Sequence, residues 1–530
     1  MPTEYSKSQA FKITIALCLA QFCIAADIAT LSIATSSLID YFQSNVDDLK
    51  VVGTIYPLIG ASLMLTSGVL GLYIGWRRML IAGLCIGVLG SIAKIFAPSI
   101  DWITYVARPL IGLAGVAILP ACIALVIGHF PAKKHAQLFG LIAASTGLAA
   151  AIIPILNGFL IDTVGWHAGF VTTGIFYVIT AVTATIWIPP LVNKPPKRFD
   201  LKGAAISLVG MICIISGLLK APDWGILTNQ SSLPIPSPLS SMSPALIFIA
   251  SGIFLMMLFV RHERKFDQRY QSALIPRNWF TNPRLNLGLL LLLTMYVIFG
   301  GLNFTLVAYL QVGLSLTAAQ TGIIVLTFAI SLITSSIITP RVFERFENST
   351  VACLGFGVCI TGAFLTVVST GTYTFEGSIY FAMVAFGLGL GMLSSQTVAI
   401  ITKSVTKEEA ERTGGLQATI RNVGLAMGIA IVAGSGQFAM ETNIREQVAL
   451  QVSPTSQIQH HVDSANSIPY ITNNVLSLYL DGLNIDREKK QFLMDINANA
   501  RQINFHTSLY IIMFFGLIGM VTSMRLRAQK

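Results

Sequence analysis

The chain has 530 residues, of which 54% are hydrophobic and only 11% are charged. Because a soluble globular protein carries about 25% charged residues, this composition excludes a soluble enzyme and indicates a membrane protein with many spans. The net charge of +10 does not indicate nucleic-acid binding here, since membrane proteins gather lysine and arginine in their cytoplasmic loops.

Apolar runs long enough to cross a bilayer recur along the whole chain. About 20 apolar residues span the hydrocarbon core, and a helix satisfies its own backbone hydrogen bonds there. We therefore predict an all-α membrane protein with fourteen transmembrane helices. Their approximate limits are residues 12–35, 51–72, 79–97, 102–127, 137–160, 168–188, 203–220, 245–262, 285–309, 319–340, 350–369, 377–400, 414–436 and 506–524.

Lysine and arginine alternate between the loops as the positive-inside rule requires. If the N-terminus is cytoplasmic, most of the 34 Lys and Arg residues fall in inner segments. We therefore predict a multi-pass protein of the cell (inner or plasma) membrane with both termini in the cytoplasm. The spans divide into a six-helix bundle (1–188), a linker with two additional spans (189–284) and a second six-helix bundle (285–530). Two pseudo-symmetric bundles are typical of transporters that rock around a midplane site.

One long outer segment, residues 437–505, interrupts the second bundle. Its residues mix apolar and polar types at helical spacing, which predicts one or two helices lying on the outer surface. A solvated loop, a lid and a docking surface for a partner such as a periplasmic adaptor are the alternatives.

Two charges lie inside the first and fourth spans. Asp27 follows ~15 residues of outward-running helix, ~22 Å up, and Arg108 lies ~9 Å below the outer face. An intramembrane acid usually marks an ion or substrate path. Arginine keeps its charge whereas a carboxylate can take up a proton, so we interpret Asp27 and Arg108 as proton-coupling residues. A static salt bridge is the alternative. Lys94, near the outer end of the third span, is expected to extend to the interface.

The loop between the second and third spans, residues 68–80, reads GVLGLYIGWRRML. It resembles the G-x-L-x-D-R-x-G-R-R signature of the major facilitator superfamily. The matching residues are Gly68, Leu70, Gly75, Arg77 and Arg78. Leu72 and Tyr73 replace the Asp and Arg of the signature, and the resemblance implies that the Asp helps to latch the two halves. The latch is therefore expected to be weaker in this chain.

Further matches resemble the fourteen-span drug:proton antiporters of the EmrB/QacA type. The first span contains DIATLSIAT, which is similar to their first-helix motif and includes Asp27. Arg108 begins RPLIGLAG, which is similar to the R-x-x-x-G element of the fourth span. The fifth span keeps part of the antiporter motif G-x-x-x-G-P-x-x-G-G. The resemblance implies the major facilitator fold, and it implies a role in conformational gating for Gly68, Gly75, Arg77, Arg78, Pro154 and Gly158.

The resemblance also suggests which spans line a substrate cavity. Aromatic and amide side chains in these spans suit an amphipathic organic compound. The candidates are Gln21, Phe22, Tyr56, Tyr296, Phe299, Asn303, Phe304, Gln396, Gln417, Arg421 and Asn422. For each of them, packing within the helix bundle is the alternative. Because Asp27 is the one clear intramembrane acid, a monocationic, neutral or zwitterionic substrate is favoured over a dication.

Together these features predict a proton-coupled multidrug efflux transporter that exports lipophilic or amphipathic compounds by alternating access and confers drug resistance. We expect it to be a monomer. The alternative is an exporter or uptake permease for one metabolite such as a siderophore, by facilitated flow or symport. A membrane-embedded enzyme would need a cluster such as H-E-x-x-H or paired intramembrane acids, which the sequence lacks. We expect no cofactor, no metal and no nucleic acid among its partners, which are the substrate, protons and lipid.

Overall fold

The structure is a computed structural model of the whole chain. It describes residues 5–43, 46–191, 199–225, 242–270, 273–316, 318–410, 413–451, 462, 468–482 and 487–528.

The first six long segments of the described chain are helical. They are α1 (Lys7–Phe42), α2 (Val46–Ile74), α3 (Trp76–Ile95), α4 (Ile100–Trp102) with the π-helical turn η1 (Ile103–Ala107) and α5 (Arg108–His129), α6 (Ala132–Val164) and α7 (Trp166–Trp187). Among these, α4, η1 and α5 together form one segment. The linker region contributes α8 (Leu201–Trp224), α9 (Pro244–Tyr270) and the short α10 (Arg277–Phe280).

The remaining helices follow the same up-and-down course. They are α11 (Pro283–Ala308) with the π-helical turn η2 (Tyr309–Gly313), α12 (Ala318–Val342), α13 (Asn348–Ser369), α14 (Ile379–Lys403), α15 (Lys407–Ala410), α16 (Thr413–Met427) with the π-helical turn η3 (Gly428–Ala433), α17 (Gly434–Gln451), α19 (Asn473–Asp481) and α20 (Arg487–Ala528).

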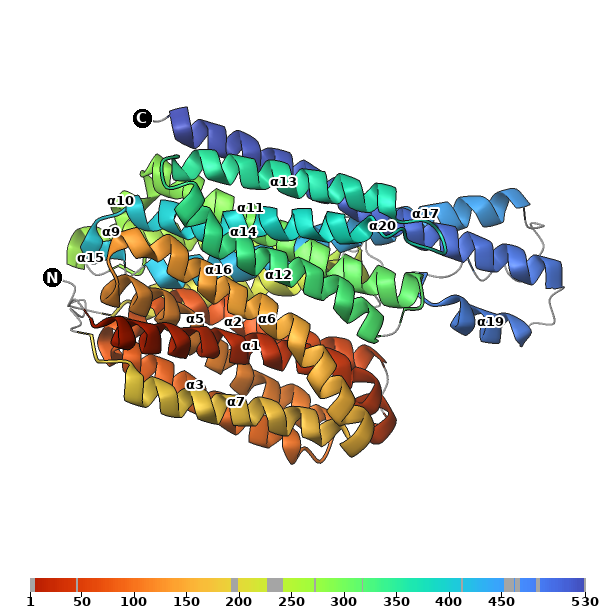
Figure 1. Cartoon of the computed structure of the whole chain (residues 1–530), viewed down its shortest axis with the longest axis horizontal. Coiled ribbons are helices and arrows are strands. Elements are labelled where there is room, and N and C mark those ends of the chain that lie inside the picture. The colour runs from red at the N-terminus through yellow and green to blue at the C-terminus, as the bar shows by residue number, and fades with distance from the viewer. Residues whose placement is uncertain are drawn as a thin grey trace.

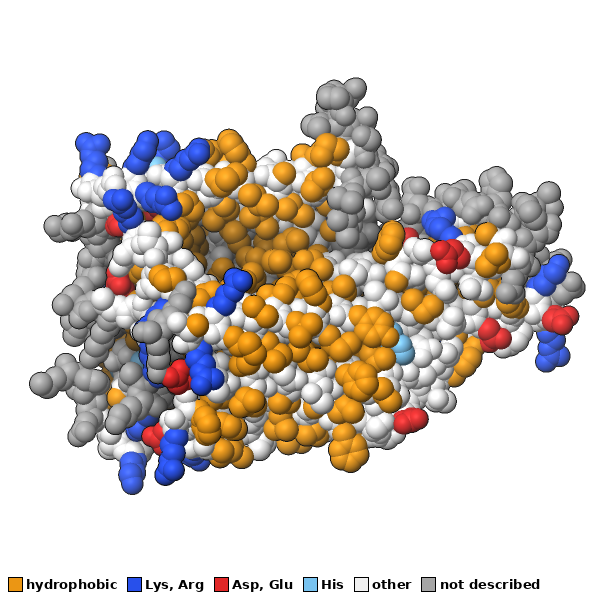
Figure 2. Space-filling model, turned by 90° about the horizontal axis from the view of Figure 1, so that it is seen from above, with side chains coloured by type: hydrophobic (Ala, Val, Ile, Leu, Met, Phe, Trp, Pro, Cys, Tyr) orange, Lys and Arg blue, Asp and Glu red, His pale blue; other side chains and the backbone are white. Residues whose placement is uncertain are grey.

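The prediction of an all-helical membrane protein is confirmed. In the described residues, 13 helical segments are long and apolar enough to cross a membrane. Helix α2, with 29 residues, covers the remaining predicted span, and its Ser62–Ile74 part is an apolar segment. Both termini lie at one end of the molecule, called here the terminal end (Figure 1). Lysine and arginine gather at this end, next to a belt of hydrophobic side chains (Figure 2).

Separate apolar cores lie inside the two halves. One is built from α1, α3, α5 and their neighbours, and another from α11, α12, α13, α14 and α20. Helices α8 and α9 pack against each other, and α8 also packs against α2 and α16. The linker helices therefore lie beside a seam at which the two halves meet.

Close helix contact at this seam depends on glycine. A Cβ atom placed on Gly68 of α2 would lie 2.6 Å from the Cα atom of Gly415 in α16. Such an approach leaves no room for a side chain on either helix, and small residues at helix crossings permit it. Gly75, between α2 and α3, has a φ of 98°, a left-handed conformation that glycine adopts without steric cost.

Residues 437–505, which were predicted to form surface helices, differ from that prediction. In the described residues, α17 and α20 do not lie on the surface but continue the spans and project beyond the bundle (Figure 1). The 42 residues of α20 extend over ~63 Å, about twice the hydrocarbon thickness of a bilayer. Met440 and Ile444 of α17 pack against Leu493 and Ile496 of α20, so the projecting pair has its own apolar core.

Candidate functional site

Asp27 lies at the centre of a buried cluster of three charged side chains. Arg108 Nη1 is 3.0 Å from Asp27 Oδ1, and the Lys94 ammonium contacts Asp27 Oδ2. The side chains of Asp27 and Lys94 are fully buried, and that of Arg108 is 2% exposed. Three spans, α1, α3 and α5, thus bring one carboxylate and two cations together, and the cluster carries a net charge of +1 when all three are ionised.

The position of Lys94 was predicted wrongly. Its side chain does not extend to the outer surface but points inward to Asp27. On an isolated helix, a lysine near the end can extend its side chain to water, and this was the basis of the prediction. The packing of α3 against α5 and α7 closes that route. One signal was available in the sequence, because a lone intramembrane acid needs a cationic partner, and Lys94 is one of the few charges within the spans.

Aromatic rings and a backbone carbonyl complete the surroundings of this cluster. Arg108 Nε donates a hydrogen bond to the carbonyl oxygen of Val52, at 3.1 Å. The guanidinium lies 5.5 Å from the ring centroid of Tyr56, and the Lys94 ammonium lies 4.8 Å from that of Phe170. Cation–π contacts of this kind stabilise a desolvated cation. Arg108 directly follows the π-helical turn η1, a local irregularity that often accompanies functional residues.

A small central cavity lies between the two halves. Its volume is about 50 Å³, and α1, α5, α6, α11, α14 and α16 all contribute to its lining. The polar lining residues are Gln21, Tyr296, Ser394, Gln417 and Arg421, and the others are apolar. Four of the predicted cavity residues therefore meet at one place. Small-molecule sites usually measure 300–1,000 Å³, so this cavity is smaller than a typical binding site.

The other predicted cavity residues lie elsewhere. Tyr56 is beside the charged cluster, Asn422 donates to Met64 Sδ between α16 and α2, and Gln396 accepts a hydrogen bond from Asn348 in the second half. Phe299 packs against Tyr296 and Phe328, Asn303 Nδ2 donates to the carbonyl oxygen of Phe299, and Phe304 is 52% exposed. These residues have the aromatic and amide side chains expected in a cavity, but the rotation of each helix about its own axis turns them toward neighbouring helices or the surface.

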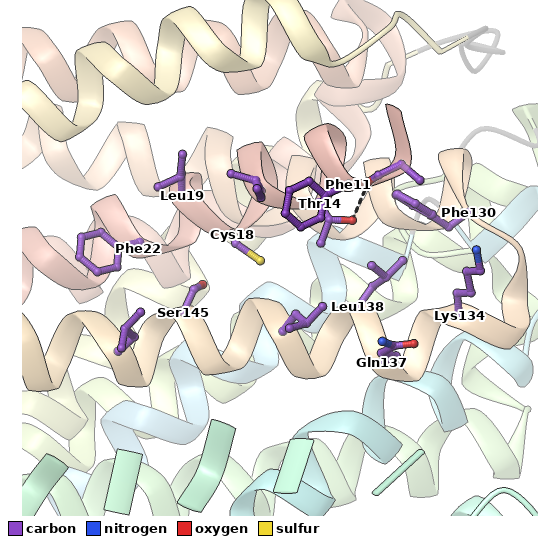
Figure 3. Close-up of a pocket in the computed structure, with 14 residues that line it drawn as sticks. Phe11, Thr14, Cys18, Leu19, Phe22, Phe130, Lys134, Gln137, Leu138 and Ser145 are labelled. Carbon is purple, nitrogen blue, oxygen red and sulfur yellow. Dashed lines mark hydrogen bonds between the residues drawn. The ribbon is translucent and has the colours of Figure 1, made fainter. Parts of the chain in front are cut away.

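Phe22 lines a different and larger space, a groove between α1 and α6 (Figure 3). The groove has a volume of about 450 Å³ and is lined mostly by apolar side chains. Lys134 and Gln137 lie at one end of it, and Phe22 lies at the other. The ring of Phe22 also packs edge-on against Phe176 of α7.

The two arginines of the loop signature have different surroundings. Arg77 Nη2 donates a hydrogen bond to the carbonyl oxygen of Thr185, at 2.6 Å, in the last turn of α7. Carbonyl groups in a last turn lack partners within their helix, so Arg77 ties α3 to α7 within the first half. Arg78 is exposed.

The proline and glycine of the fifth span lie within one helix. Pro154 is inside α6, where a proline removes a backbone hydrogen bond and bends the helix. The nearest side-chain atom to a Cβ on Gly158 would be 4.0 Å away, on Ile33. Gly158 therefore leaves open space around α6 rather than permitting a close contact.

Comparison with known proteins agrees with this architecture. A family model described as Major Facilitator Superfamily matches residues 17–429. The chain is 25% identical over 450 residues to the tetracenomycin C resistance and export protein of Streptomyces glaucescens, covering 81% of this chain and 77% of the relative. It is 25% identical to the multidrug resistance protein Stp of Mycobacterium tuberculosis, over 85% of this chain and 81% of the relative. Among solved structures, the human organic anion transporter MFSD10 (TETRAN) has a TM-score of 0.57 at 10% identity, covering 96% of this chain and 100% of that chain.

Proposed function

Because the chain belongs to the Major Facilitator Superfamily, we propose that it is a proton-coupled secondary transporter that exports lipophilic or amphipathic organic compounds by alternating access. The chain is a transporter rather than an enzyme. The names of the bacterial relatives describe export and drug resistance, which supports the direction and the substrate class. The observation that carries proton coupling is the buried cluster of Asp27, Lys94 and Arg108.

When all three side chains are ionised, the two cations outweigh the single carboxylate, and the loss of one proton makes the cluster neutral. Arginine stays protonated, so the proton that can leave belongs to the pair formed by Asp27 and Lys94. With a proton on this pair the cluster carries +1, and without it the cluster is neutral. An uncompensated charge in a dry site is costly, and access to water lowers that cost. Opening the site to one side of the membrane and then the other would therefore load and release a proton.

Alternating access requires contacts that can form and break between the halves. At the terminal end, Gly68 and Gly415 are in backbone contact, and a Cβ on Gly140 of α6 would lie 2.5 Å from the carbonyl oxygen of Ser336 in α12. These contacts, together with the small central cavity, describe a state that is closed at the terminal end. In our proposal, separation of the halves at these glycines opens the cavity to that side.

We assign the terminal end to the cytoplasm. Many lysine and arginine side chains gather at this end (Figure 2), and the last turn of α20, which contains Arg525 and Arg527, also lies there (Figure 1). The positive-inside rule places such residues in the cytoplasm. The pair α17 and α20 then projects from the outer face, where it is a surface for a partner such as a periplasmic adaptor. We propose that one chain forms a complete transporter, since both halves contribute to the central cavity.

The test is transport in proteoliposomes with an imposed pH gradient and a panel of lipophilic dyes. We expect active accumulation that stops when a protonophore collapses the gradient. Accumulation that persists without any gradient, or transport that merely equilibrates the dye at every gradient, would contradict proton coupling. Cells with and without the protein, loaded with the same dyes, would distinguish export from uptake.

A further inference from the structure

The central cavity contains a cation without a matching acid. Arg421, on α16, is the charged residue among the lining residues, and no aspartate or glutamate contributes to the lining. Its guanidinium lies 5.0 Å from the ring centroid of Tyr296, on α11. Within the described part of the chain, no carboxylate lies within ion-pair distance of Arg421, in contrast to Arg108 beside Asp27.

A buried hydrogen-bond acceptor lies one helical turn away from this cation. Gln417 precedes Arg421 by four residues, so both side chains lie on the same face of α16. The side chain of Gln417 is 2% exposed, and its Nε2 atom donates to Thr413 Oγ1 at 2.8 Å. Its Oε1 atom has no hydrogen-bond partner among the described residues. Buried polar groups are almost always paired, so this oxygen lacks a donor that a bound compound can supply.

The rest of the lining suits an apolar body. Leu119 and Ile123 of α5 and Phe139 of α6 line the cavity from the first half, and Met295 and Tyr296 of α11 line it from the second. Small-molecule sites combine walls of this kind with a few polar groups that fix the orientation of the ligand. A cationic compound would meet the charge of Arg421 without an acid to offset it.

We propose that the central cavity selects amphipathic aromatic anions, which carry a carboxylate or phenolate for Arg421 and a nearby hydroxyl or amide hydrogen for Gln417. This inference rests on the proposed transport function and specifies its substrate class. It differs from the sequence-based expectation of a monocationic, neutral or zwitterionic substrate. Because the cavity of about 50 Å³ holds only one or two water molecules, the anion enters when the halves separate.

The experiment measures binding in the absence of a pH gradient, so that it does not depend on proton coupling. Fluorescein and rhodamine 123 are suitable probes, because they share a phenylxanthene body but carry opposite charge at neutral pH. Equilibrium dialysis with the purified full-length protein in detergent gives both affinities. We expect the protein to bind fluorescein about tenfold more tightly or better, as a charge-assisted hydrogen bond in a buried site provides.

Variants of the cavity then test the residues. Arg421→Gln should remove the preference for fluorescein, Arg421→Lys should keep part of it, and Arg525→Gln at an exposed arginine of α20 should leave it unchanged. If Arg421→Gln does not fold, Gln417→Leu provides the test, since it removes the acceptor and should weaken fluorescein more than rhodamine 123.

Tighter binding of rhodamine 123 by the unchanged protein, or a preference that survives Arg421→Gln, would overturn the proposal. Loss of gradient-driven transport in a protein that still prefers fluorescein would instead count against proton coupling alone. A protein that accumulates rhodamine 123 with the gradient but not fluorescein would retain the transport function and refute the substrate class.

Discussion

Replacing Lys94 by methionine separates proton coupling from the stability of the buried cluster. In the native cluster, Asp27 contacts two cations, Lys94 and Arg108. The substitution Lys94→Met keeps the contact between Asp27 and Arg108 at 3.0 Å and removes the cation that can release a proton. With Asp27 ionised beside Arg108, the cluster then has a net charge of zero, so we expect it to remain folded and to lose its response to pH.

The expected magnitudes differ strongly between two substitutions. Lys94→Met leaves Asp27 paired with Arg108 and removes the unbalanced positive charge, so it leaves no buried charge unpaired and should change stability by only about 1 kcal/mol or less. Asp27→Asn instead leaves two cations without a counter-charge, and removal of one partner from a buried pair costs about 3–5 kcal/mol. Lys94→Met is therefore a cleaner test of coupling than the substitution of the acid.

The assay compares active accumulation with counterflow in proteoliposomes. At one proton per substrate, each pH unit supplies about 1.36 kcal/mol, which supports about tenfold accumulation. We expect the native protein to accumulate substrate with the gradient and Lys94→Met to equilibrate it only, while counterflow exchange continues. Lys134→Met, the same substitution at an exposed lysine, should behave as the native protein does. Accumulation by Lys94→Met at the native level would refute this account of coupling.

Three further predictions test the supporting structure. Gly68→Leu should abolish transport, because its side chain would separate α2 from α16, whereas Gly357→Ala, where a Cβ meets nothing within 4 Å, should have little effect in the same assay. Arg77→Ala should lower the free energy of unfolding by about 0.5–1.5 kcal/mol through loss of its exposed hydrogen bond to α7, and equal stability of Arg77→Ala and Arg78→Ala would contradict that role. Arg501 donates to the carbonyl oxygen of residue 471 at 2.7 Å, so Arg501→Ala should make α19 more sensitive to protease while transport continues; unchanged cleavage would argue against this tether.

Much of the architecture could be predicted from the sequence, because the bilayer imposes strong constraints on composition. A span must be apolar, about 20 residues long and helical, and each of these properties is visible in a single chain. The loop motif around Gly68 and Gly75, together with the acid Asp27, indicated the family. The structure gave Gly75 a positive φ and Gly68 a backbone contact, which are the physical reasons for glycine at these two positions.

The partners of the charged residues were decided by the tertiary structure. Depth along each helix suggested that Asp27 and Arg108 lie at a similar level, but depth does not reveal the rotation of a helix about its axis. That rotation turns Lys94 toward Asp27, Arg421 toward the central cavity and Phe304 toward the surface. The sequence by itself determined that charges lie within the spans, because each costs free energy in a bilayer. Only the packing of helices distant in sequence determined which charge is neutralised and which faces the cavity.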